Sequence, residues 1–183
     1  AEGGLSAGRV TALSGVTDFF GIGPEIWGED DAASALKSFV SVYYHFEVDS
    51  GLLSDHERAA LAQVRFLLKG TASLQLPKCT QGEKISDDVV IGPTSGSMRF
   101  DIEGPFQMVG FGILPAGWGV LTSRCASLYL NRTVRLDGFF PALRQCGQRL
   151  RRAENPADYP AIMDEELQRV FAGADPATLA FTE

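Results

Sequence analysis

Apolar and polar residues alternate with a period of two through the middle of the chain, which is the pattern of half-buried β-strands. The first such segment covers residues 41–48, where Val42, Tyr44, Phe46 and Val48 alternate with more polar neighbours. Further strands are predicted over the ranges 63–70, 71–77, 89–91, 97–102 and 106–114. Strands that follow one another at such short intervals are typical of a β-barrel or a β-sandwich.

Glycine and proline mark the turns between these strands. Lys69-Gly70-Thr71 predicts a hairpin turn, and Gly104-Pro105 predicts the turn between the last two strands. The polar residues 49–61 are interpreted as a linker. Within this linker, Ser54 and Glu57 have the spacing of a capping box, which would begin one turn of helix.

After Pro115 the apolar spacing changes to three and four residues, the pattern of amphipathic helices. Helices are predicted over the ranges 116–124, 138–152 and 158–172, with a short one over 31–39. Asp158 is suited to cap the last helix, and Gly173 is suited to end it.

The order of these elements predicts an α+β fold. We expect a β-barrel over residues 39–114, a helical segment over 115–175, an N-terminal arm over 1–38 that packs on the domain, and a tail over 176–183. The chain has 183 residues, of which 45% are apolar and 21% charged. That is enough for one sizeable core of a globular domain. Because the chain does not begin with Met, we expect it to be a fragment of a longer protein.

Charge and cysteine content exclude several classes of protein. The formal net charge is −7, so the surface repels phosphate backbones and anionic lipid. The three cysteines are widely spaced, which disfavours a disulfide framework or a zinc ribbon and predicts thiols in the reducing cytoplasm. No apolar run approaches the length of a membrane span. We therefore expect a cytoplasmic protein with no membrane partner.

One cluster of basic residues occurs in this otherwise acidic chain. Four arginines lie between Arg144 and Arg152, and the neighbouring helix carries Asp164, Glu165 and Glu166. The two helices therefore carry opposite charges, which favours pairing between them or a solvated face over a nucleic-acid site. We expect the three carboxylates to face away from the core.

The sequence offers no catalytic constellation and no metal site. The segment 4–8, GLSAG, matches the G-x-S-x-G pattern, but too few residues precede it to form the strand that a nucleophile elbow needs. A metal-binding barrel typically places two His residues one position apart on a strand. Here His45 and His56 are eleven positions apart. We predict no enzyme activity, no cofactor and no metal.

The polar faces of the predicted strands hold the candidate ligand residues Tyr43, His45, Arg65 and Arg99. Two arginines that point into a barrel would suit an anionic small molecule. If these faces point outward, the same residues are ordinary sheet surface. Periodicity does not decide between the two, because a shift of one residue in register exchanges the faces.

Five successive segments carry a family resemblance, namely FVSVYYHFEV, AQVRFLLKG, VVIGPTSGSMRF, GPFQMVGFGILPAGWGVL and NRTVRLDGFFPALRQ. In this order they resemble the N-terminal half of AraC-family transcription regulators, over residues 39–172. The most specific matches are the turn Gly92-Pro93-Thr94-Ser95 and the strand end Gly110–Trp118, which leads into a helix.

The resemblance implies a cupin-like β-barrel followed by helices, with a role in effector sensing and dimerisation rather than catalysis. In the family, a pair of helix-turn-helix motifs follows and binds DNA. No recognition-helix pattern occurs before Glu183, so the resemblance places DNA binding in a domain outside this chain. The effector is not named by the resemblance. The alternatives are a free-standing cupin-like enzyme or small-molecule-binding protein, and a domain that only binds other proteins.

The last two predicted helices each carry an apolar stripe, and part of that surface often remains for a partner. The resemblance also implies self-association, in which a two-fold dimer would use one surface twice. We expect a homodimer whose contact includes Met163, Val170 and Phe171. The alternative is that these side chains belong to the core of the monomer.

The acidic net charge generates a first prediction. The isolated chain should show no salt-sensitive affinity for duplex DNA at physiological ionic strength, because it has no excess of cations to replace the counterions of the phosphates. An electrophoretic band-shift experiment tests this. A shift at low micromolar protein that disappears with added salt would contradict it and would point to the arginines of residues 144–152.

Overall fold

The structure of the chain is a computed structural model that describes residues 25–27 and 34–174. Its strands are β1 (Glu25–Trp27), β2 (Val40–Val48), β3 (Leu52–Glu57), β4 (Gln63–Lys69), β5 (Ala72–Gln75), β6 (Glu83–Ile85), β7 (Val89–Ile91), β8 (Met98–Glu103), β9 (Phe106–Ile113) and β10 (Thr133–Arg135). They form a larger sheet of order β1-β2-β9-β4-β7-β10 and a smaller sheet of order β3-β8-β5-β6. All strand pairs are antiparallel.

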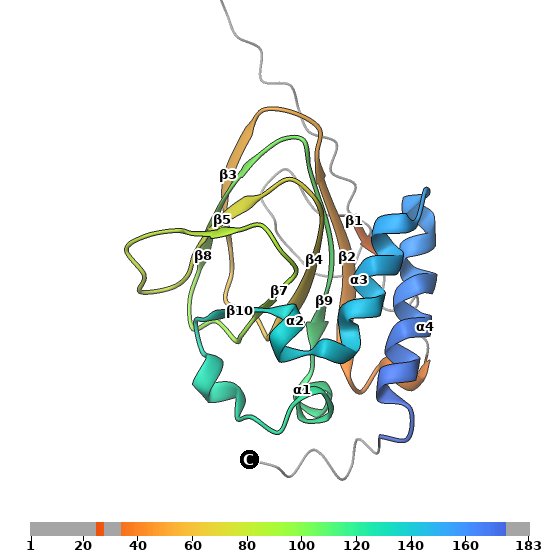
Figure 1. Cartoon of the computed structure of the whole chain (residues 1–183). Coiled ribbons are helices and arrows are strands. Elements are labelled where there is room, and N and C mark those ends of the chain that lie inside the picture. The colour runs from red at the N-terminus through yellow and green to blue at the C-terminus, as the bar shows by residue number, and fades with distance from the viewer. Residues whose placement is uncertain (1–24, 28–33, 175–183) are drawn as a thin grey trace, which may run out of the picture.

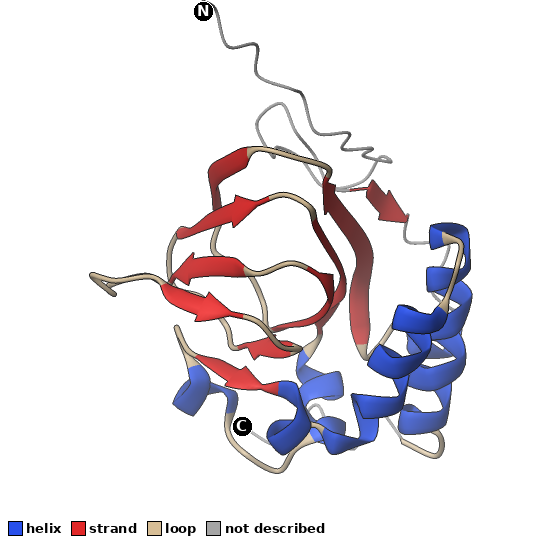
Figure 2. Ribbon diagram, turned by 45° about the horizontal axis from the view of Figure 1, so that its top comes forward, coloured by secondary structure: helices blue, strands red, loops and turns tan. Residues whose placement is uncertain are grey.

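The helical elements are η1 (Ser34–Leu36), α1 (Pro115–Leu121), η2 (Ala126–Tyr129), α2 (Leu136–Phe139), η3 (Pro141–Leu143), α3 (Arg144–Arg152), η4 (Pro156–Asp158) and α4 (Tyr159–Phe171). The two sheets face each other, and α3 and α4 lie side by side against the larger sheet (Figures 1 and 2). The predicted α+β class, with β-structure first and helices after it, is confirmed. In the described residues the strands form two facing sheets, an arrangement closer to a sandwich than to one closed barrel.

Two hydrophobic cores lie on opposite sides of the larger sheet. The inner core fills the space between the sheets and includes Phe46, Leu67 and Phe100. The outer core joins the larger sheet to the helices and includes Phe66. Successive side chains of a strand point to opposite faces, so Phe66 and Leu67 of β4 serve different cores. Because the larger sheet is covered on both faces, the range Met108–Ile113 of its central strand β9 carries no polar side chain.

The region predicted as one helix over 138–152 consists of three shorter elements, α2, η3 and α3. The division falls at Pro141, which has no backbone N–H and disfavours helical geometry in the residue before it. That residue, Phe140, has φ −124° and ψ 68°, outside the helical range. The predictions over 116–124 and 158–172 agree with α1 and α4, apart from their ends.

The prediction of a linker with a helical turn at Ser54 is wrong. Residues 52–57 form β3, which pairs residue by residue with β8. The Ser54 hydroxyl donates to Asp101 across the strands at 2.6 Å, so it does not cap a helix. Exposed strands with little apolar alternation are held by such cross-strand bonds, which local sequence does not display.

Two predicted local features take other forms. Gly70 does not close a hairpin, because β4 and β5 belong to different sheets and the residue joins them. Its φ of 79° favours glycine, and a Cβ there would lie 2.7 Å from the Pro105 carbonyl oxygen. Asp158 makes no capping bond. The Asn155 side chain instead accepts from the Ala157 N–H at 3.0 Å, at the start of η4.

Of the predicted arm over 1–38, the structure describes β1 and residues 34–38. β1 pairs with β2 and forms an edge of the larger sheet. The rest of the arm, and the tail predicted over 176–183, lie outside the described residues. The chain turns at Gly104-Pro105 between β8 and β9, as predicted, and passes there from the smaller sheet to the larger one.

One arginine of α3, Arg149, pairs with carboxylates of α4, as the opposite charges of the two helices predicted. Arg151 pairs instead with Asp88, and Arg144 with Asp137. Arg149 bonds to Glu165 at 2.6 Å and to Glu166 at 2.9 Å, and Arg169 bonds to Glu166 at 2.7 Å. The expectation that Glu166 faces away from the core is wrong, because it is 2% exposed. Burial alone would raise the pKa of Glu166, but the bonds from both arginines outweigh this and lower it.

The helix residues chosen for a dimer contact lie mostly inside the monomer. Met163 is fully buried, and Phe171 is buried with its ring stacked on Phe39, 4.7 Å between centroids. Val170 is half-buried and packs against the same outer core. The expectation that Met163 and Phe171 face outward is therefore wrong, since covering the larger sheet takes up both side chains.

Replacing Glu166 with Gln should destabilise the chain by about 1–3 kcal/mol at neutral pH, because two charge-assisted bonds are weakened. The pKa of Glu166 is lower in the folded chain than the unfolded value of 4.5, so its ionised carboxylate stabilises the folded state above pH 4.5. This contribution disappears as the pH falls through the folded-state pKa of Glu166. The difference between wild type and variant should therefore shrink at acidic pH. Urea unfolding at several pH values measures this difference in stability.

The exposed neighbour Glu165→Gln is the control and should change stability far less. An equal loss for both variants would contradict the assignment.

Candidate functional site

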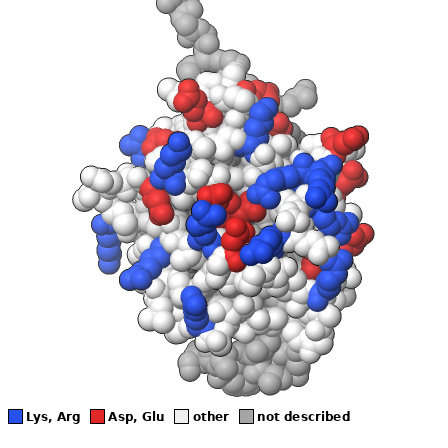
Figure 3. Space-filling model, in the orientation of Figure 1, with Lys and Arg blue, Asp and Glu red and all other residues white. Residues whose placement is uncertain are grey.

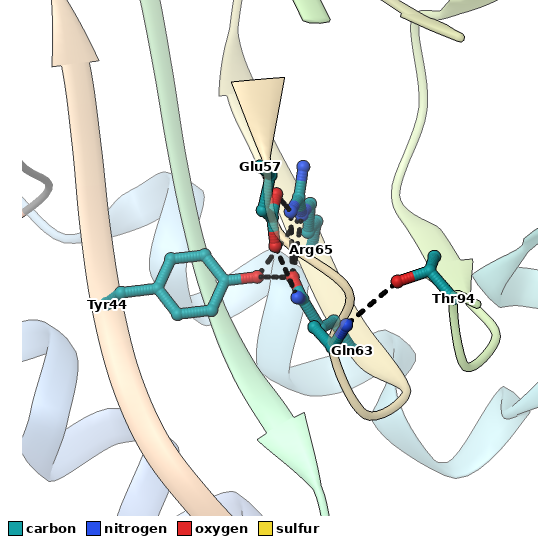
Figure 4. Close-up of polar contacts among 6 residues, drawn as sticks. Tyr44, Glu57, Gln63, Arg65 and Thr94 are labelled. Atoms are coloured by element: carbon teal, nitrogen blue, oxygen red, sulfur yellow. Dashed lines mark hydrogen bonds and ion pairs between the residues drawn. The ribbon is translucent and has the colours of Figure 1, made fainter. Parts of the chain in front are cut away.

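Four polar side chains form a cluster at one end of the space between the sheets (Figure 4). They are Tyr44, Glu57, Gln63 and Arg65, which we call the Arg65 cluster. Glu57 is the last residue of β3 and Gln63 the first of β4, so the loop over 58–62 joins two members of the cluster. Arg65 follows on β4, and its side chain points to the inner face of the larger sheet, as Leu67 does.

Arg65 is the centre of the cluster. Its Nη2 donates to Glu57 and, at 2.8 Å, to Oε1 of Gln63. Its Nε donates to the Tyr44 hydroxyl and to Gln63 Oε1, both at 3.2 Å. The Tyr44 hydroxyl donates to Gln63 Oε1 at 2.9 Å, and Gln63 Nε2 donates to Glu57 Oε1 at 2.5 Å. The four side chains thus form one connected network around a buried ion pair.

Burial and charge shift the pKa values of the cluster. The Arg65 and Glu57 side chains are only 6% and 12% exposed. Burial alone would lower the pKa of Arg65, but the adjacent Glu57 carboxylate outweighs this and raises it, so the guanidinium stays charged. Burial raises the pKa of Tyr44 to about 12, although Arg65 opposes that rise. At neutral pH the cluster therefore contains a charged guanidinium and a neutral phenol.

Gly110 makes the cluster geometrically possible. It lies on β9, between Tyr44 on β2 and Arg65 on β4, and pairs with both residues. A Cβ at Gly110 would lie 2.5 Å from the Tyr44 hydroxyl oxygen and 2.6 Å from the Val64 carbonyl oxygen. Only glycine at this position leaves room for the Tyr44 ring to cross β9 and reach Arg65.

The loop beside the cluster is fastened to a second loop. The Ala60 N–H donates to the Thr94 hydroxyl at 2.9 Å, and the Thr94 N–H donates to the Ala60 carbonyl oxygen at 3.0 Å. Thr94 belongs to the segment GPTS singled out in the sequence, whose neighbour Ser95 bonds to Asn131. The segment therefore closes the end of the sandwich at which the cluster lies.

The four predicted ligand residues do not come together. Arg65 alone lies in the space between the sheets. Tyr43 and His45 point to the opposite face of β2, where the Tyr43 hydroxyl donates to Asp164 of α4 at 2.7 Å and His45 contacts the ring of Tyr159. The Gln107 amide lies 3.0 Å from Nε2 of His45.

Arg99 lies on the outer, solvent-exposed face of the smaller sheet, where it pairs with Asp101 at 2.8 Å. The two predicted arginines therefore do not share one interior, which removes the basis for expecting an anionic ligand. Sequence reasoning misses Glu57 and Gln63 as site residues, because Glu57 lies in the predicted linker over 49–61, which has no strand periodicity. Tyr44 was predicted on the opposite face to Tyr43, which the structure confirms.

The remaining candidate features are metal ligands, nucleophiles, thiols and membrane-spanning helices. In residues 25–27 and 34–174, no three His, Cys, Asp or Glu side chains are placed to hold a metal ion. The GLSAG segment lies outside the described residues. Cys79 and Cys125 are exposed and Cys146 is buried, all as free thiols. Of the helices described, none is long and apolar enough to cross a bilayer.

No protein-family model matches the sequence, and no curated protein matches it either. Among solved structures, apo ToxT from Vibrio cholerae is 12% identical over 74% of this chain and 54% of its own, with TM-score 0.43. A cupin domain from Bordetella pertussis Tohama I is 17% identical over 49% and 90%, with TM-score 0.32. A protein of unknown function from Acidithiobacillus ferrooxidans is 18% identical over 38% and 65%, with TM-score 0.31.

ToxT and a cupin domain are thus among the similar structures. At TM-scores below 0.5 these similarities do not decide the family or the function of the chain.

Gly110→Ala should destabilise the chain by about 1–3 kcal/mol, because the added methyl group displaces the Tyr44 ring or the β4 backbone. Gly138→Ala is the matched control, since a Cβ at Gly138 meets no atom within 4 Å. That change should be neutral or stabilising by up to about 1 kcal/mol. Urea unfolding measures both. Equal stabilities of the two variants would show that Tyr44 does not depend on the glycine.

Proposed function

We propose that this chain is the effector-sensing and dimerisation domain of a cytoplasmic, DNA-binding transcription regulator. It carries out no catalysis, and in this proposal DNA is bound by another domain. The observation that carries the proposal is the Arg65 cluster, a buried, fully connected polar group at the end of an otherwise apolar interior. Such a combination of apolar walls with a few fixed polar groups is typical of small-molecule sites. The sequence resemblance to AraC-family regulators supports the regulatory role.

The chemistry of the cluster favours binding over catalysis. Its phenol and guanidinium keep their protons at neutral pH, since the pKa values of both are raised. Neither group is therefore suited to serve as a general base near neutrality. Glu57 is held by Arg65 and Gln63. A free-standing cupin-like enzyme or small-molecule-binding protein is the alternative function.

The dimer contact in this proposal lies away from the buried side chains of α4. Exposed large apolar side chains in the described part of the chain are Leu52, Leu61, Leu128 and Leu130. Leu128 lies in η2 and Leu130 directly follows it, 63% and 46% exposed. The outward residues of α4 are mainly polar, and Arg169 and Glu165 are engaged in ion pairs. We therefore assign the contact to the η2 surface, defined as Leu128 and Leu130.

A reporter assay tests the proposal. The whole chain is fused to a bacterial repressor DNA-binding domain that represses its operator only as a dimer. We expect repression by the fusion, and at least a tenfold loss of repression for the double variant Leu128→Asp/Leu130→Asp, because buried charge breaks an apolar contact. Leu52→Asp is the control, since Leu52 is 81% exposed and lies in β3 of the smaller sheet.

Light scattering over a tenfold concentration range accompanies the assay. A monomer mass throughout, with no repression by the fusion, would overturn the dimerisation part of the proposal. Repression that survives the double variant in a folded protein would show that the dimer uses another surface. Turnover of a small molecule that is lost on Arg65→Met would favour the enzyme alternative.

A further inference from the structure

One nitrogen of the buried Arg65 guanidinium has no partner among the residues that the structure describes. There, Nε and Nη2 make the side chain's hydrogen bonds, to Tyr44, Gln63 and Glu57. Within the described residues no acceptor is bonded to Nη1, although the side chain is only 6% exposed. In the same part of the chain, every side-chain nitrogen or oxygen that is fully buried has a partner. Nη1 therefore lies where solvent reaches it, with two N–H donors unused.

The cross-strand neighbours of three cluster residues are apolar. Val89 is the cross-strand neighbour of Arg65, and Ile91 is the neighbour of Gln63. Met98 is the neighbour of Glu57 on the other sheet. All three belong to the inner core, so the polar cluster directly adjoins an apolar wall. These three side chains are at most 4% exposed, so a molecule held at Nη1 would contact them only by entering the packed inner core.

The charge of the cluster decides which molecules fit. Glu57 neutralises Arg65, and the second arginine, Arg99, lies on the outer face of the smaller sheet. An anion that approached Nη1 would be attracted by the guanidinium and repelled by the adjacent carboxylate, and would lose its hydration for little gain. A neutral carbonyl oxygen needs only a donor, and Nη1 offers two.

We infer that the Arg65 cluster binds a neutral small molecule that presents a carbonyl or amide oxygen to Nη1 of Arg65 and has an apolar body, in preference to an anion. The inference rests on the proposed sensing function and names the chemical class of its effector. In this assignment Glu57 is a specificity-determining residue. Its carboxylate excludes anions by cancelling the charge that would attract them.

Benzamide and benzoate are matched probes, because they share a ring and differ in the charge of the group that accepts the hydrogen bond. Binding to the full chain is followed by ¹⁵N NMR of the Arg65 Nε–H resonance, assigned by its loss in Arg65→Lys. Wild type should bind benzamide at least tenfold more tightly than benzoate. Glu57→Gln leaves the guanidinium charge unbalanced and should reverse this preference. Glu103→Gln, an exposed change in β8, should leave the preference as in wild type.

The possible outcomes distinguish a failure of the proposed ligand class from a failure of the proposed sensing function. A wild-type preference for benzoate would overturn the inference while leaving an effector site at Arg65. No shift of the Arg65 resonance with either probe would also overturn it and would remove the cluster as a sensing site, whereas the reporter assay tests dimerisation independently. If Glu57→Gln fails to fold, the comparison of the two probes on wild type decides alone. A preference in Glu57→Gln equal to that of wild type would show that Glu57 does not set specificity.

Discussion

The larger sheet is covered on both faces, and most of the structure follows from that constraint. The smaller sheet covers its inner face, while α3 and α4 cover its outer face (Figure 1). A strand in this position has no solvent-facing side, so each polar side chain that it carries needs a partner. On the inner face Arg65 is satisfied by Glu57, and on the outer face Tyr43 is satisfied by Asp164. On the face of the molecule seen in Figure 3, basic and acidic side chains lie intermixed on the surface.

β2 connects the two faces through three consecutive residues. Tyr43 and His45 contact α4, and Tyr44 between them belongs to the Arg65 cluster. Tyr44 is therefore the immediate chain neighbour of both side chains that contact α4. The register irregularity between Val40 and Tyr43 sets which of these residues faces which layer. The strand thus links the candidate ligand site to the helical layer without an intervening loop.

Period-two alternation located the strands over 41–48 and 63–70, because those strands are long and their two faces differ in composition. It did not locate β3, whose exposed and half-buried residues are held by pairing with β8. The spacing of apolar residues also joined α2, η3 and α3 into one helix, since a stripe of side chains continues across the break at Pro141. Long-range pairing and a local backbone break are the two kinds of information that periodicity lacks.

The candidate site was predictable only in part, through Arg65. The two arginines on predicted strand faces favoured an anionic ligand, because a single sequence does not show where the carboxylate that neutralises Arg65 lies. Glu57 comes from a segment without strand periodicity and reaches Arg65 because β3 ends where β4 begins. A buried ion pair of this kind contributes little net stability compared with apolar residues of the same volume, since both charges lose their hydration. An apolar quartet would hold the two sheets together equally well, so the distinctive property of the cluster is the set of hydrogen-bond donors it keeps fixed beside an apolar wall.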